Sequence, residues 1–304
     1  MLSRALPLAG RVALVAGATR GCGRSIAVEL ARAGAHVYAT GRSSRAAGRS
    51  ELDRPETIEE TGELVASVGE GTALRVDHLE PVEVQELVAR VRRDHGRLDV
   101  LVNDIFGGDR YAQWGTPLWK HDVVGGLRVL EMGLHTHLVT AALALPLMLE
   151  SGDGLVVEMT DGTREVNAGY RREVGPYYAL VKSSIERVLL GLTVDLDGTG
   201  VTPVAVTPGW VRSEAMLEGF GVTEGTWREA VAAQPGFAVS ESPAFVGRGV
   251  AALAADPGRG DFAGEVVTSH GLAVHYGHTD LDGSRPDVWG FMAAGSPEPA
   301  DDWR

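Results

Sequence analysis

The chain has 304 residues, of which 44% are hydrophobic, and a formal net charge of −13 at pH 7. That charge argues against nucleic-acid and anionic-membrane partners, which require a positive patch, and favours a small-molecule partner. A single cysteine cannot form an internal disulfide, so we expect a reducing, cytoplasmic environment.

Short β-rich segments alternate with helical segments along the chain. Strands are expected at residues 11–17, 35–40, 72–78, 98–104, 154–160, 201–209 and 264–269. Helices are expected at residues 25–34, 55–68, 81–95, up to about 150, around 177–182 and at 244–256. Because the strands are apolar throughout, this order predicts a parallel sheet with helices on both faces. We therefore expect a doubly wound, Rossmann-type α/β fold in one domain spanning residues 1–304.

Some stretches fall outside this alternation. Residues 43–54 are rich in Arg, Ser and Gly and predict a surface loop. Residues from about 212 to 242, after the sixth strand, mix aromatic and charged side chains, which indicates a lid. Residues 293–304 are expected to form a loose tail. The apolar segment 138–150 is shorter than a membrane span, so we expect a buried or interface helix and no membrane partner.

The first turn carries Gly17, Gly21 and Gly23 between the first strand and the first helix. Glycines there let the backbone approach a pyrophosphate, whose charge is stabilised at the positive helix N-terminus. This context predicts a dinucleotide site, and a plain turn without a ligand is the alternative. Cys22, between two of these glycines, is expected to pack rather than to act in redox chemistry.

The choice of dinucleotide depends on charge at the end of the second strand. An acidic residue there would accept the ribose hydroxyls of NAD and repel the extra phosphate of NADP. The segment 39–44 has no acid, and Arg42, with Arg20 from the glycine turn, could bind that phosphate. NADP (NADPH) is therefore the expected cofactor. The alternative is that both arginines are solvated surface residues.

Tyr178 and Lys182 lie four residues apart in the helical segment YYALVK, so they share one helix face while Tyr177 points elsewhere. A lysine ammonium near a phenol stabilises phenolate and lowers the phenol pKa from its usual value near 10. Tyr178 is therefore a candidate acid in ketone reduction and base in alcohol oxidation. Taken alone, the pair also fits a snorkelling contact.

Taken in order, the motifs of residues 8–270 resemble those of the short-chain dehydrogenase/reductase family. The family turn TGxxxGxG corresponds to AGATRGCG at 16–23, NNAG lies where this chain has VND at 102–104, YxxxK corresponds to residues 178–182, and PGxVxT corresponds to PGWVRS at 208–213. The resemblance implies that the lysine also holds the nicotinamide ribose. Together these arguments assign the cofactor to Gly17, Thr19, Arg20, Gly21, Gly23, Arg42, Asp77, Asn103, Lys182, Pro208, Gly209, Val211 and Ser213.

The chain departs from the family at the serine that hydrogen-bonds the substrate oxygen. The segment EMTDG places Thr160 and Asp161 where the family often has two serines. An ionised Asp161 accepts hydrogen bonds but does not donate them, and its charge would oppose a developing alkoxide. Three interpretations remain: Thr160 or Thr163 supplies the hydroxyl, Asp161 stays protonated, or Asp161 engages another part of the substrate. Thr160 is the preferred candidate.

A second departure is Gly133, which stands where the family commonly has an asparagine that helps hold a proton-relay water. Any relay must therefore be built differently. His135 and His137 diverge on their helix, which predicts packing or solvated side chains rather than a metal pair. No metal site is expected near the C-terminus either, because no recognised ligand spacing occurs among His270, His275, His278, Asp280 and Asp282.

The sequence thus predicts an NADP-dependent oxidoreductase that acts on a carbonyl or alcohol of a small organic molecule. The alternative is a dinucleotide-binding regulator without turnover, suggested by Asp161 and Gly133, although retention of the Tyr–Lys pair argues against it. The apolar helices around 126–150 and 178–194 resemble those through which family members pair. We therefore expect a homodimer or homotetramer.

Overall fold

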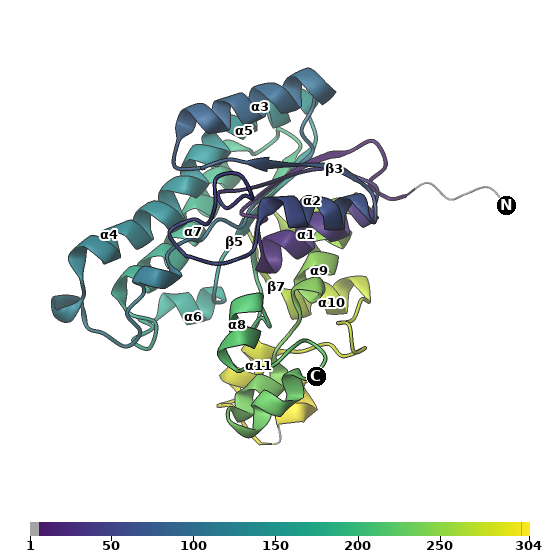
Figure 1. The fold of residues 1–304 in the computed structure, drawn as a ribbon. Helices are drawn as coiled ribbons and strands as arrows, with labels where there is room; N and C mark the ends of the chain where they lie inside the picture. The colour runs from purple at the N-terminus through teal and green to yellow at the C-terminus, as the bar shows by residue number, and fades with distance from the viewer. Residues whose placement is uncertain (1–5, 299) are drawn as a thin grey trace.

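The computed structural model describes residues 6–298 and 300–304, and a parallel seven-stranded sheet runs through its centre (Figure 1). The strands lie in the order β3-β2-β1-β4-β5-β6-β7. Their bounds are β1 Val12–Ala16, β2 His36–Gly41, β3 Glu70–Arg75, β4 Val100–Asn103, β5 Gly154–Met159, β6 Val201–Thr207 and β7 Val266–Thr268. The predicted doubly wound Rossmann-type fold is confirmed, and each predicted strand forms.

Helices connect the strands and cover both faces of the sheet (Figure 1). The α-helices are α1 Gly21–Arg32, α2 Ile58–Ala66, α3 Pro81–His95, α4 Val123–Leu130, α5 Thr136–Ser151, α6 Arg164–Ala168, α7 Pro176–Asp195, α8 Glu214–Gly219, α9 Pro243–Ala255, α10 Ser269–Tyr276 and α11 Val288–Ala293. The 3-10 helices are η1 Asp109–Tyr111, η2 Leu118–Lys120, η4 Trp227–Ala232, η5 Pro235–Val239, η6 Arg259–Phe262 and η7 Ala300–Trp303, and η3 Glu131–His135 is a π-helix.

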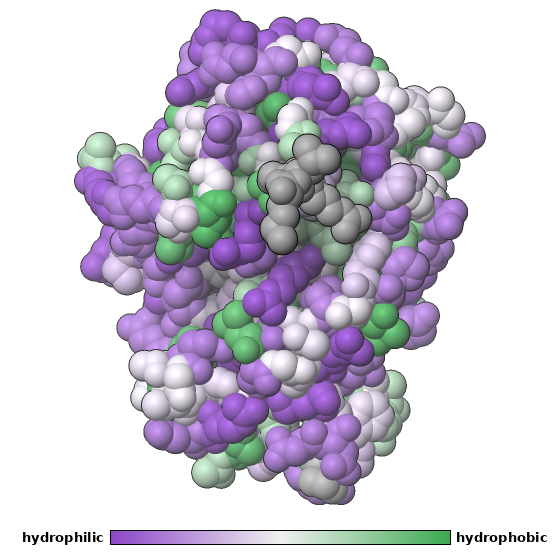
Figure 2. All heavy atoms as spheres, turned by 90° about the vertical axis from the view of Figure 1, so that its right-hand side faces the viewer, coloured by the Kyte–Doolittle hydropathy of each residue, from purple (hydrophilic) through white to green (hydrophobic). Residues whose placement is uncertain are grey.

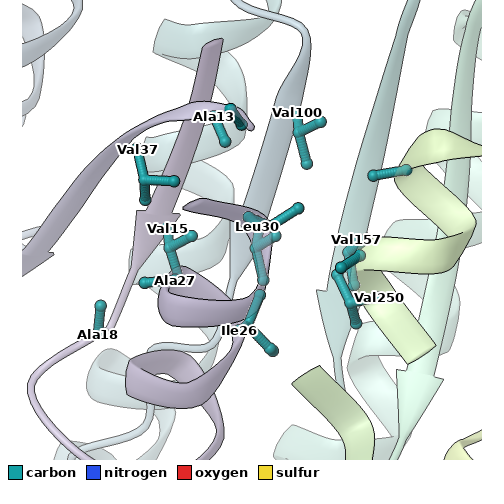
Figure 3. Packing of buried hydrophobic residues seen from close by; sticks show 14 of the residues in the cluster. Ala13, Val15, Ala18, Ile26, Ala27, Leu30, Val37, Val100, Val157 and Val250 are labelled. Carbon is teal, nitrogen blue, oxygen red and sulfur yellow. The ribbon is translucent and has the colours of Figure 1, made fainter. Parts of the chain in front are cut away.

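The core consists of two apolar layers, one on each face of the sheet. Alternate residues of a strand point to opposite faces, so Ala13 and Val15 of β1 pack in the layer that contains α1 and α9 (Figure 3). Val12 and Leu14 pack in the other layer, with α3 and α5. Burial on both faces explains why the strand sequences are apolar throughout.

Helices α4, η3 and α5 form one continuous helical segment, Val123–Ser151, that is long and apolar enough to cross a membrane by length and composition alone. Half of its most apolar window is buried inside the protein, which is typical of a core helix. The predicted helix at 138–150 is the buried C-terminal part of this segment, and its contacts with α3, β4 and β5 account for its apolar character.

A small lobe, formed by residues 212–242, 287–298 and 300–304, lies below the sheet in Figure 1. Its core is aromatic: the ring of Phe237 contacts Phe220, Trp210 and Trp227, with centroids 4.7, 5.2 and 6.0 Å apart. The segment 212–242 therefore has its own packed interior. Its movement as a lid stays a prediction.

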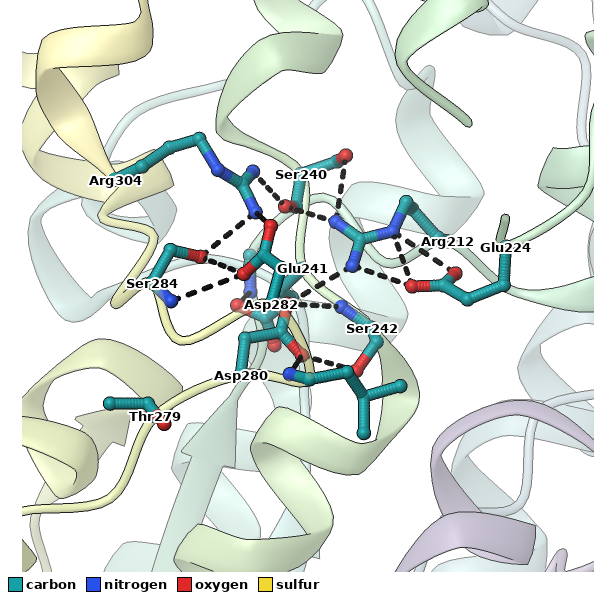
Figure 4. Close-up of polar contacts among 12 residues, drawn as sticks. Arg212, Glu224, Ser240, Glu241, Ser242, Thr279, Asp280, Asp282, Ser284 and Arg304 are labelled. Carbon is teal, nitrogen blue, oxygen red and sulfur yellow. Dashed lines mark hydrogen bonds and ion pairs between the residues drawn. The ribbon is translucent and has the colours of Figure 1, made fainter. Parts of the chain in front are cut away.

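A buried ionic network joins the two parts of this lobe (Figure 4). The Arg212 guanidinium donates to Asp280 at 3.0 Å and to Glu224 at 2.8 Å. Arg304 donates to the backbone oxygens of Ala238 and Ser240, at 2.6 and 2.7 Å. Arg212 also donates to the backbone oxygen of Ser240 at 2.5 Å, so two guanidinium groups hold the segment 238–240 from opposite sides (Figure 4).

The predicted loose tail at 293–304 is wrong for residues 300–304. The ring of Trp303 packs against Phe291, with centroids 6.2 Å apart, and Ala300 is buried. The polar composition of this segment suggests disorder, but one tryptophan and one arginine find partners in the lobe. The consequence is that the C-terminal segment supports α11 from outside.

The apolar surface is uneven. The face that carries α9 and α10 is mainly hydrophilic, with isolated hydrophobic residues (Figure 2). Exposed large hydrophobic side chains occur instead on α4 and α7, namely Val123, Val124, Leu127, Leu180, Leu190 and Val194. These helices contact each other on the opposite side of the molecule (Figure 1).

Candidate active site

The first cavity lies at the carboxyl ends of β1 and β4, where the strand order changes direction. Open α/β sheets bind ligands at this switch point. The cavity is lined by Gly17, Thr19, Arg20, Gly21, Cys22, Gly41, Arg42, Ser43, Ser50, Leu52, Arg54, Glu56, Val76, Asp77, His78, Leu79, Asp104, Ile105, Phe106, Gly107, Asp109, Met132, Thr136, Val211 and Ser213. It thus gathers eight of the predicted cofactor residues from four separate segments.

Close backbone approach explains two of the glycines in the first turn. Gly17 has φ +89°, and a Cβ there would lie 2.3 Å from the carbonyl oxygen of Asp104. A Cβ on Gly23 would lie 2.5 Å from the carbonyl oxygen of Gly17. Gly23 therefore allows the turn to pack and does not itself line the cavity, whereas Gly21 does. The N-terminus of α1 consequently opens on the cavity.

A carboxylate from the small lobe occupies this helix N-terminus. Oε2 of Glu214, the first residue of α8, accepts a hydrogen bond of 2.9 Å from the backbone N–H of Gly21. Its Oε1 lies 3.4 Å from Nη1 of Arg24. An anion at a helix N-terminus is favourable for the same reasons that a phosphate is. Glu214 therefore stands where a pyrophosphate would be expected.

Both arginines predicted to bind the extra phosphate line the first cavity, but each is paired with an acid. Arg42 donates to Oε1 of Glu51 at 2.9 Å, and Arg20 to Asp109 at 3.3 Å. Glu51 also accepts hydrogen bonds from Arg128 and Tyr111. Burial raises the Glu51 pKa, but the hydrogen bonds from Arg128, Tyr111 and Arg42 outweigh it and lower the pKa to about 2. Glu51 is thus a fixed negative charge beside Arg42.

Residues 43–54, predicted as a surface loop, form one wall of the first cavity. Ser43, Ser50, Leu52 and Arg54 face the interior. The loop is held across the cavity because Glu51 bonds to side chains of η1 and α4, as described above. The predicted surface loop is present, with residues 45–49 exposed, and it also forms part of the cavity wall. Its polar sequence gives no indication that Glu51 accepts hydrogen bonds from three side chains.

After β3, Asp77 and His78 line the same cavity. Asp77 accepts a hydrogen bond from the backbone N–H of Leu79, at 3.0 Å. His78 is buried between the hydroxyls of Thr40 and Thr140, at 2.8 and 2.7 Å. Burial, and then the charge of a neighbouring histidine, lower the His78 pKa to about 3. This end of the cavity is therefore neutral apart from Asp77.

Asn103, predicted to bind the cofactor, points away from both cavities. Its Nδ2 donates to Oε1 of the buried Glu158 at 2.8 Å. Oε2 of Glu158 lies 2.6 Å from Nδ1 of His137, whose Nε2 lies 3.1 Å from the carbonyl oxygen of Ile105. His137 is thus a buried network residue, whereas His135 is exposed. The network fixes the segment after β4, so Asn103 acts on the cavity only through the backbone.

The second cavity adjoins the first, since Asp104 and Val211 line both. It is lined by Asp104, Met159, Thr160, Asp161, Arg171, Tyr178, Lys182, Pro208, Gly209, Trp210, Val211, Met216, Val288, Trp289 and Met292. Polar groups gather on the side of β5 and α7, and apolar side chains from the small lobe form the opposite wall. Three lining residues, Val288, Trp289 and Met292, come from α11 near the predicted tail.

Tyr178 and Lys182 both face the second cavity, whereas Tyr177 packs against His121 with ring centroids 4.8 Å apart. Phe106 and Trp114 flank the Tyr178 ring, at 5.4 and 5.2 Å. The Lys182 ammonium lies 4.3 Å from the centroid of the Phe106 ring and 5.5 Å from that of Tyr178. The helical spacing thus brings together the two side chains that the sequence singled out.

The prediction that Thr160 supplies the substrate hydroxyl does not agree with the structure. The Thr160 hydroxyl donates to the backbone carbonyl of Lys182 at 2.8 Å, and a hydroxyl has one proton to give. Asp161 instead contacts the phenol: the Tyr178 hydroxyl donates to its Oδ2 at 2.9 Å. Burial, followed by the charge and hydrogen bond of Asp161, raises the Tyr178 pKa well above its usual value.

Two further features of the second cavity were not visible in the sequence. Arg171, from the turn before α7, lies 3.1 Å from Oδ2 of Asp161. Asp104 is partly buried, and loss of solvation raises its pKa to about 6 although the Lys182 charge opposes the shift. Arg171 belongs to no local motif, and Asp104 ends the VND segment, in which only Asn103 was singled out. Only the fold brings them to the phenol and the lysine.

Gly133 lies in the π-helix η3 and faces α7. A Cβ there would lie 2.6 Å from Cγ1 of Val181 and 2.9 Å from Cδ2 of Phe106. No larger side chain fits without moving these groups. The structure therefore contains no room for a relay side chain at this position.

The segment 208–213, in which four cofactor-binding residues were predicted, contributes to both cavities, and a buried acid supports it. Oε2 of Glu241 accepts hydrogen bonds from the N–H of Gly209 at 3.0 Å and from the hydroxyl of Ser269 at 2.6 Å. Burial raises the pKa of Glu241 to about 8. Ser213 itself caps α8 by accepting from the N–H of Met216, at 3.3 Å.

The remaining candidates do not add chemistry to this site. Burial, and then the charge of Asp104, raise the pKa of the Cys22 thiol well above its usual value, which disfavours a reactive thiolate. In residues 6–298 and 300–304, no group of three His, Cys, Asp or Glu side chains is placed to hold a metal ion. His270 and His278 bond to the backbone oxygens of Arg285 and Phe245, at 3.1 and 3.2 Å.

Comparisons with known proteins agree with this geometry. A sequence profile described as short chain dehydrogenase matches residues 11–220. The mouse protein named dehydrogenase/reductase SDR family member 1 is 32% identical over 289 residues, covering 91% of this chain and 85% of the relative. An uncharacterized NAD-dependent oxidoreductase of Mycobacterium tuberculosis is 31% identical, covering 72% and 80%. The fold is similar to that of a metagenomic short-chain oxidoreductase solved in complex with NADP (TM-score 0.64, 21% identity, covering 86% and 98%).

Proposed function

The chain belongs to the short-chain dehydrogenase/reductase family, and we propose that it transfers a hydride between NADP and a carbonyl or alcohol of a small organic molecule, with Tyr178 as acid and base. Family membership supports an oxidoreductase with a nicotinamide cofactor. The observation that carries the proposal is the position of Tyr178 and Lys182 in a cavity that adjoins the glycine turn.

The first cavity fits a dinucleotide at its glycine turn, where a pyrophosphate would displace the Glu214 carboxylate from the N–H of Gly21. At Gly17 and Gly23 a Cβ would collide with backbone, and the N-terminus of α1 offers N–H groups to a pyrophosphate. Lys182, Gly209 and Val211 line the adjoining cavity and would hold the nicotinamide half. When bound, the nicotinamide supplies the hydride in reduction and accepts it in oxidation.

Preference for NADP rests on Arg42. It lines the first cavity directly after β2, which ends without an acid, and it can meet a phosphate with two N–H groups. One structural neighbour was solved with NADP, whereas one relative is named as NAD-dependent. Because Glu51 holds Arg42 at 2.9 Å, binding of the extra phosphate must compete with this carboxylate.

The cofactor preference can be tested at Arg42. We expect Arg42→Ala to weaken NADPH binding by about 1.5 to 3 kcal/mol, the contribution of a charge-assisted hydrogen bond, and to leave NADH nearly unchanged. Calorimetric titration of the purified protein with each cofactor measures both affinities. Arg49→Ala, an exposed arginine of the same loop, is the matched control. Equal losses for both cofactors in Arg42→Ala would rule out phosphate recognition by this residue.

The acid–base role of Tyr178 follows from its surroundings. The Lys182 charge favours phenolate, while burial and Asp161 oppose it. A phenol that stays neutral can still carry a proton if it gives one up as it receives another. The geometry therefore supports Tyr178 as the group that contacts the substrate oxygen, with its proton balance shared by a neighbouring side chain.

The wall of the second cavity indicates the class of substrate. Trp210, Trp289, Met216, Met292 and Val288 offer an apolar surface opposite the polar side. Such a wall binds an apolar body by burying its surface, and the polar side orients one oxygen. We infer a small organic carbonyl or alcohol with an apolar portion.

A regulator that binds NADP without turnover is the second candidate. It is favoured by the contact between Tyr178 and Asp161, because an ionised carboxylate at 2.9 Å opposes formation of phenolate. The two candidates differ in one measurement: a regulator binds NADPH but does not oxidise it with any member of a carbonyl panel. An enzyme oxidises NADPH with at least one.

The surroundings of the enzyme are also proposed. The exposed apolar side chains of α4 and α7 suit pairing with a second copy, so we propose a homodimer or homotetramer. We propose a cytoplasmic location because the chain has one cysteine. Sedimentation analysis of the wild type and of Val124→Asp, with matched control Val82→Asp on the exposed face of α3, tests the pairing. A monomeric wild type would contradict it.

A further inference from the structure

Three side chains stand in sequence along the polar side of the second cavity. The Tyr178 hydroxyl donates to Oδ2 of Asp161 at 2.9 Å, and Nη1 of Arg171 lies 3.1 Å from the same oxygen. All three line the cavity. A proton acceptor is therefore in contact with the phenol, and a fixed cation is in contact with the acceptor.

This arrangement is held by the backbone as well as by charge. The backbone oxygen of Asp161 accepts from Nη1 of Arg171 at 3.1 Å and from Nδ2 of Asn167 at 3.3 Å. Asn167 also donates to Glu186 of α7 at 2.9 Å. The Arg171 side chain is only 12% exposed. The loop after β5 is thus tied to the helix that carries Tyr178, which fixes the carboxylate on the phenol.

We propose that Asp161 is the terminal proton carrier of the reaction and that Arg171 is a positioning residue that holds its carboxylate against the Tyr178 hydroxyl. This inference rests on the proposed oxidoreductase function. In alcohol oxidation, the substrate O–H bond breaks and its proton binds the Tyr178 oxygen. At the same time the Tyr178 O–H bond breaks and that proton binds Oδ2 of Asp161, while the hydride leaves for the cofactor. In carbonyl reduction each transfer runs in reverse.

This relay removes two difficulties of the site. Tyr178 stays neutral throughout, so its burial and the adjacent carboxylate no longer oppose catalysis. The relay also needs no side chain at Gly133, where Val181 and Phe106 fill the space. The departures from the family pattern at residues 133 and 161 thus compensate each other.

Other charged groups face the pair from several elements and contribute to its titration. They are Lys182 of α7, Asp104 after β4, Asp109 of η1, and Glu173, which lies 3.4 Å from Nε of Arg171. None of these four lies within salt-bridge distance of the Asp161 carboxylate; among the described residues, Arg171 does. A change at Arg171 should therefore act on Asp161 more strongly than a change at any other charge.

The first test needs no turnover. Phenolate absorbance of the cofactor-free protein is followed from pH 8 to 11, and the spectrum of Tyr178→Phe is subtracted to isolate Tyr178. We expect Tyr178→Phe to leave the wild-type signal nearly unchanged in this range, because Tyr178 does not ionise. In the Asp161→Asn background the adjacent charge is gone, so the same subtraction should reveal ionisation of Tyr178 at a pH at least about one unit lower than in the wild type. Identical titration of Tyr178 with and without Asp161 would overturn the proposal.

The second test measures alcohol oxidation with NADP as a function of pH. Without the guanidinium the carboxylate is harder to form, so the acidic limb of the profile should move up by about one pH unit in Arg171→Gln and return toward the wild type in Arg171→Lys. The neighbouring exposed residue supplies the matched control Arg172→Gln, which should not move the limb. An unmoved limb in Arg171→Gln would contradict the positioning role. If even the wild type oxidises no alcohol, the proposed function fails, and the phenol titration still decides the contact.

Discussion

Single acidic residues determine the electrostatics of both cavities. Glu51 faces Arg42 in the first cavity, and Asp161 faces Tyr178 in the second. Asp104, which lines both cavities, is partly buried, and loss of solvation raises its pKa to about 6. Each acid is placed beside a group that the family chemistry requires to be positive or proton-carrying. Cofactor choice and proton transfer in this chain should therefore depend on these carboxylates as much as on the family motifs.

The buried Glu241 gives a prediction for stability. Burial raises its pKa from 4.5 to about 8, so between these values the native state holds a proton that the unfolded chain has released. Stability therefore falls as pH rises through this window. Glu241→Gln removes the titration, and the free energy of unfolding should then decline less from pH 5 to pH 8, by a few kcal/mol relative to the wild type. Urea unfolding at several pH values measures this difference.

The control for that experiment is Glu86→Gln, an exposed glutamate on α3. Its pH dependence should match that of the wild type. If Glu241→Gln also matches the wild type, Glu241 is ionised in the folded protein. In that case its hydrogen bonds to Gly209 and Ser269 stabilise a charge rather than a neutral acid.

The residues that sequence reasoning missed have no local pattern. Tyr178 and Lys182 were found because helical spacing places them on one face. Arg171 and Glu51 lie in irregular segments, and their partners are 10 and 77 residues away in Asp161 and Arg128. Thr160 was misassigned because the sequence shows that it has a hydroxyl but not what that hydroxyl binds. In the structure it donates to a backbone carbonyl of α7.

At the level of elements, helix α8 couples the small lobe to the first cavity. Its Glu214 binds the N–H of Gly21, where a pyrophosphate would compete for the same donor. Glu214→Gln removes the competing charge, so affinity for NADPH and NADH should rise equally, by about tenfold or 1.4 kcal/mol. Fluorescence titration with both cofactors measures this.

The comparison variant is Glu229→Gln, an exposed glutamate of η4 in the same lobe. It should leave both affinities unchanged. If Glu214→Gln weakens binding, α8 stabilises the bound cofactor instead of competing with it. A gain for NADPH alone would mean that Glu214 acts on the extra phosphate and not on the pyrophosphate.

The sheet and its helices followed from the sequence, but the small lobe did not. The central strands β1, β4, β5 and β6 are buried along their whole length, and their mainly apolar sequences do not depend on the loops. The lobe is built from short helices, which are joined by an aromatic cluster and by the Arg212 network. Neither of these features gives the sequence a regular hydrophobic periodicity. Residues 300–304 likewise have no hydrophobic periodicity, and their polar composition gave no indication that they pack against the lobe.

At the level of the whole molecule, the lobe and the sheet enclose one continuous site. The sheet side supplies the glycine turn, Tyr178 and Lys182, and the lobe supplies an apolar wall and Glu214. Asp104 lies where the two cavities meet. A cofactor in the first cavity would thus present its reactive ring to the phenol in the second. The arrangement explains how one chain can bind a dinucleotide and orient a carbonyl.

The most direct test of this account is turnover of NADPH by wild type, Tyr178→Phe and Tyr177→Phe with a panel of carbonyl compounds. The wild type should oxidise NADPH with at least one compound. Tyr178→Phe should keep NADPH affinity and lose about 10² to 10⁴-fold in turnover, since the phenol acts chiefly in the transition state, while Tyr177→Phe should keep most activity. Tyr178→Phe with more than about a tenth of wild-type turnover, or Tyr177→Phe as the damaged variant, would contradict the account.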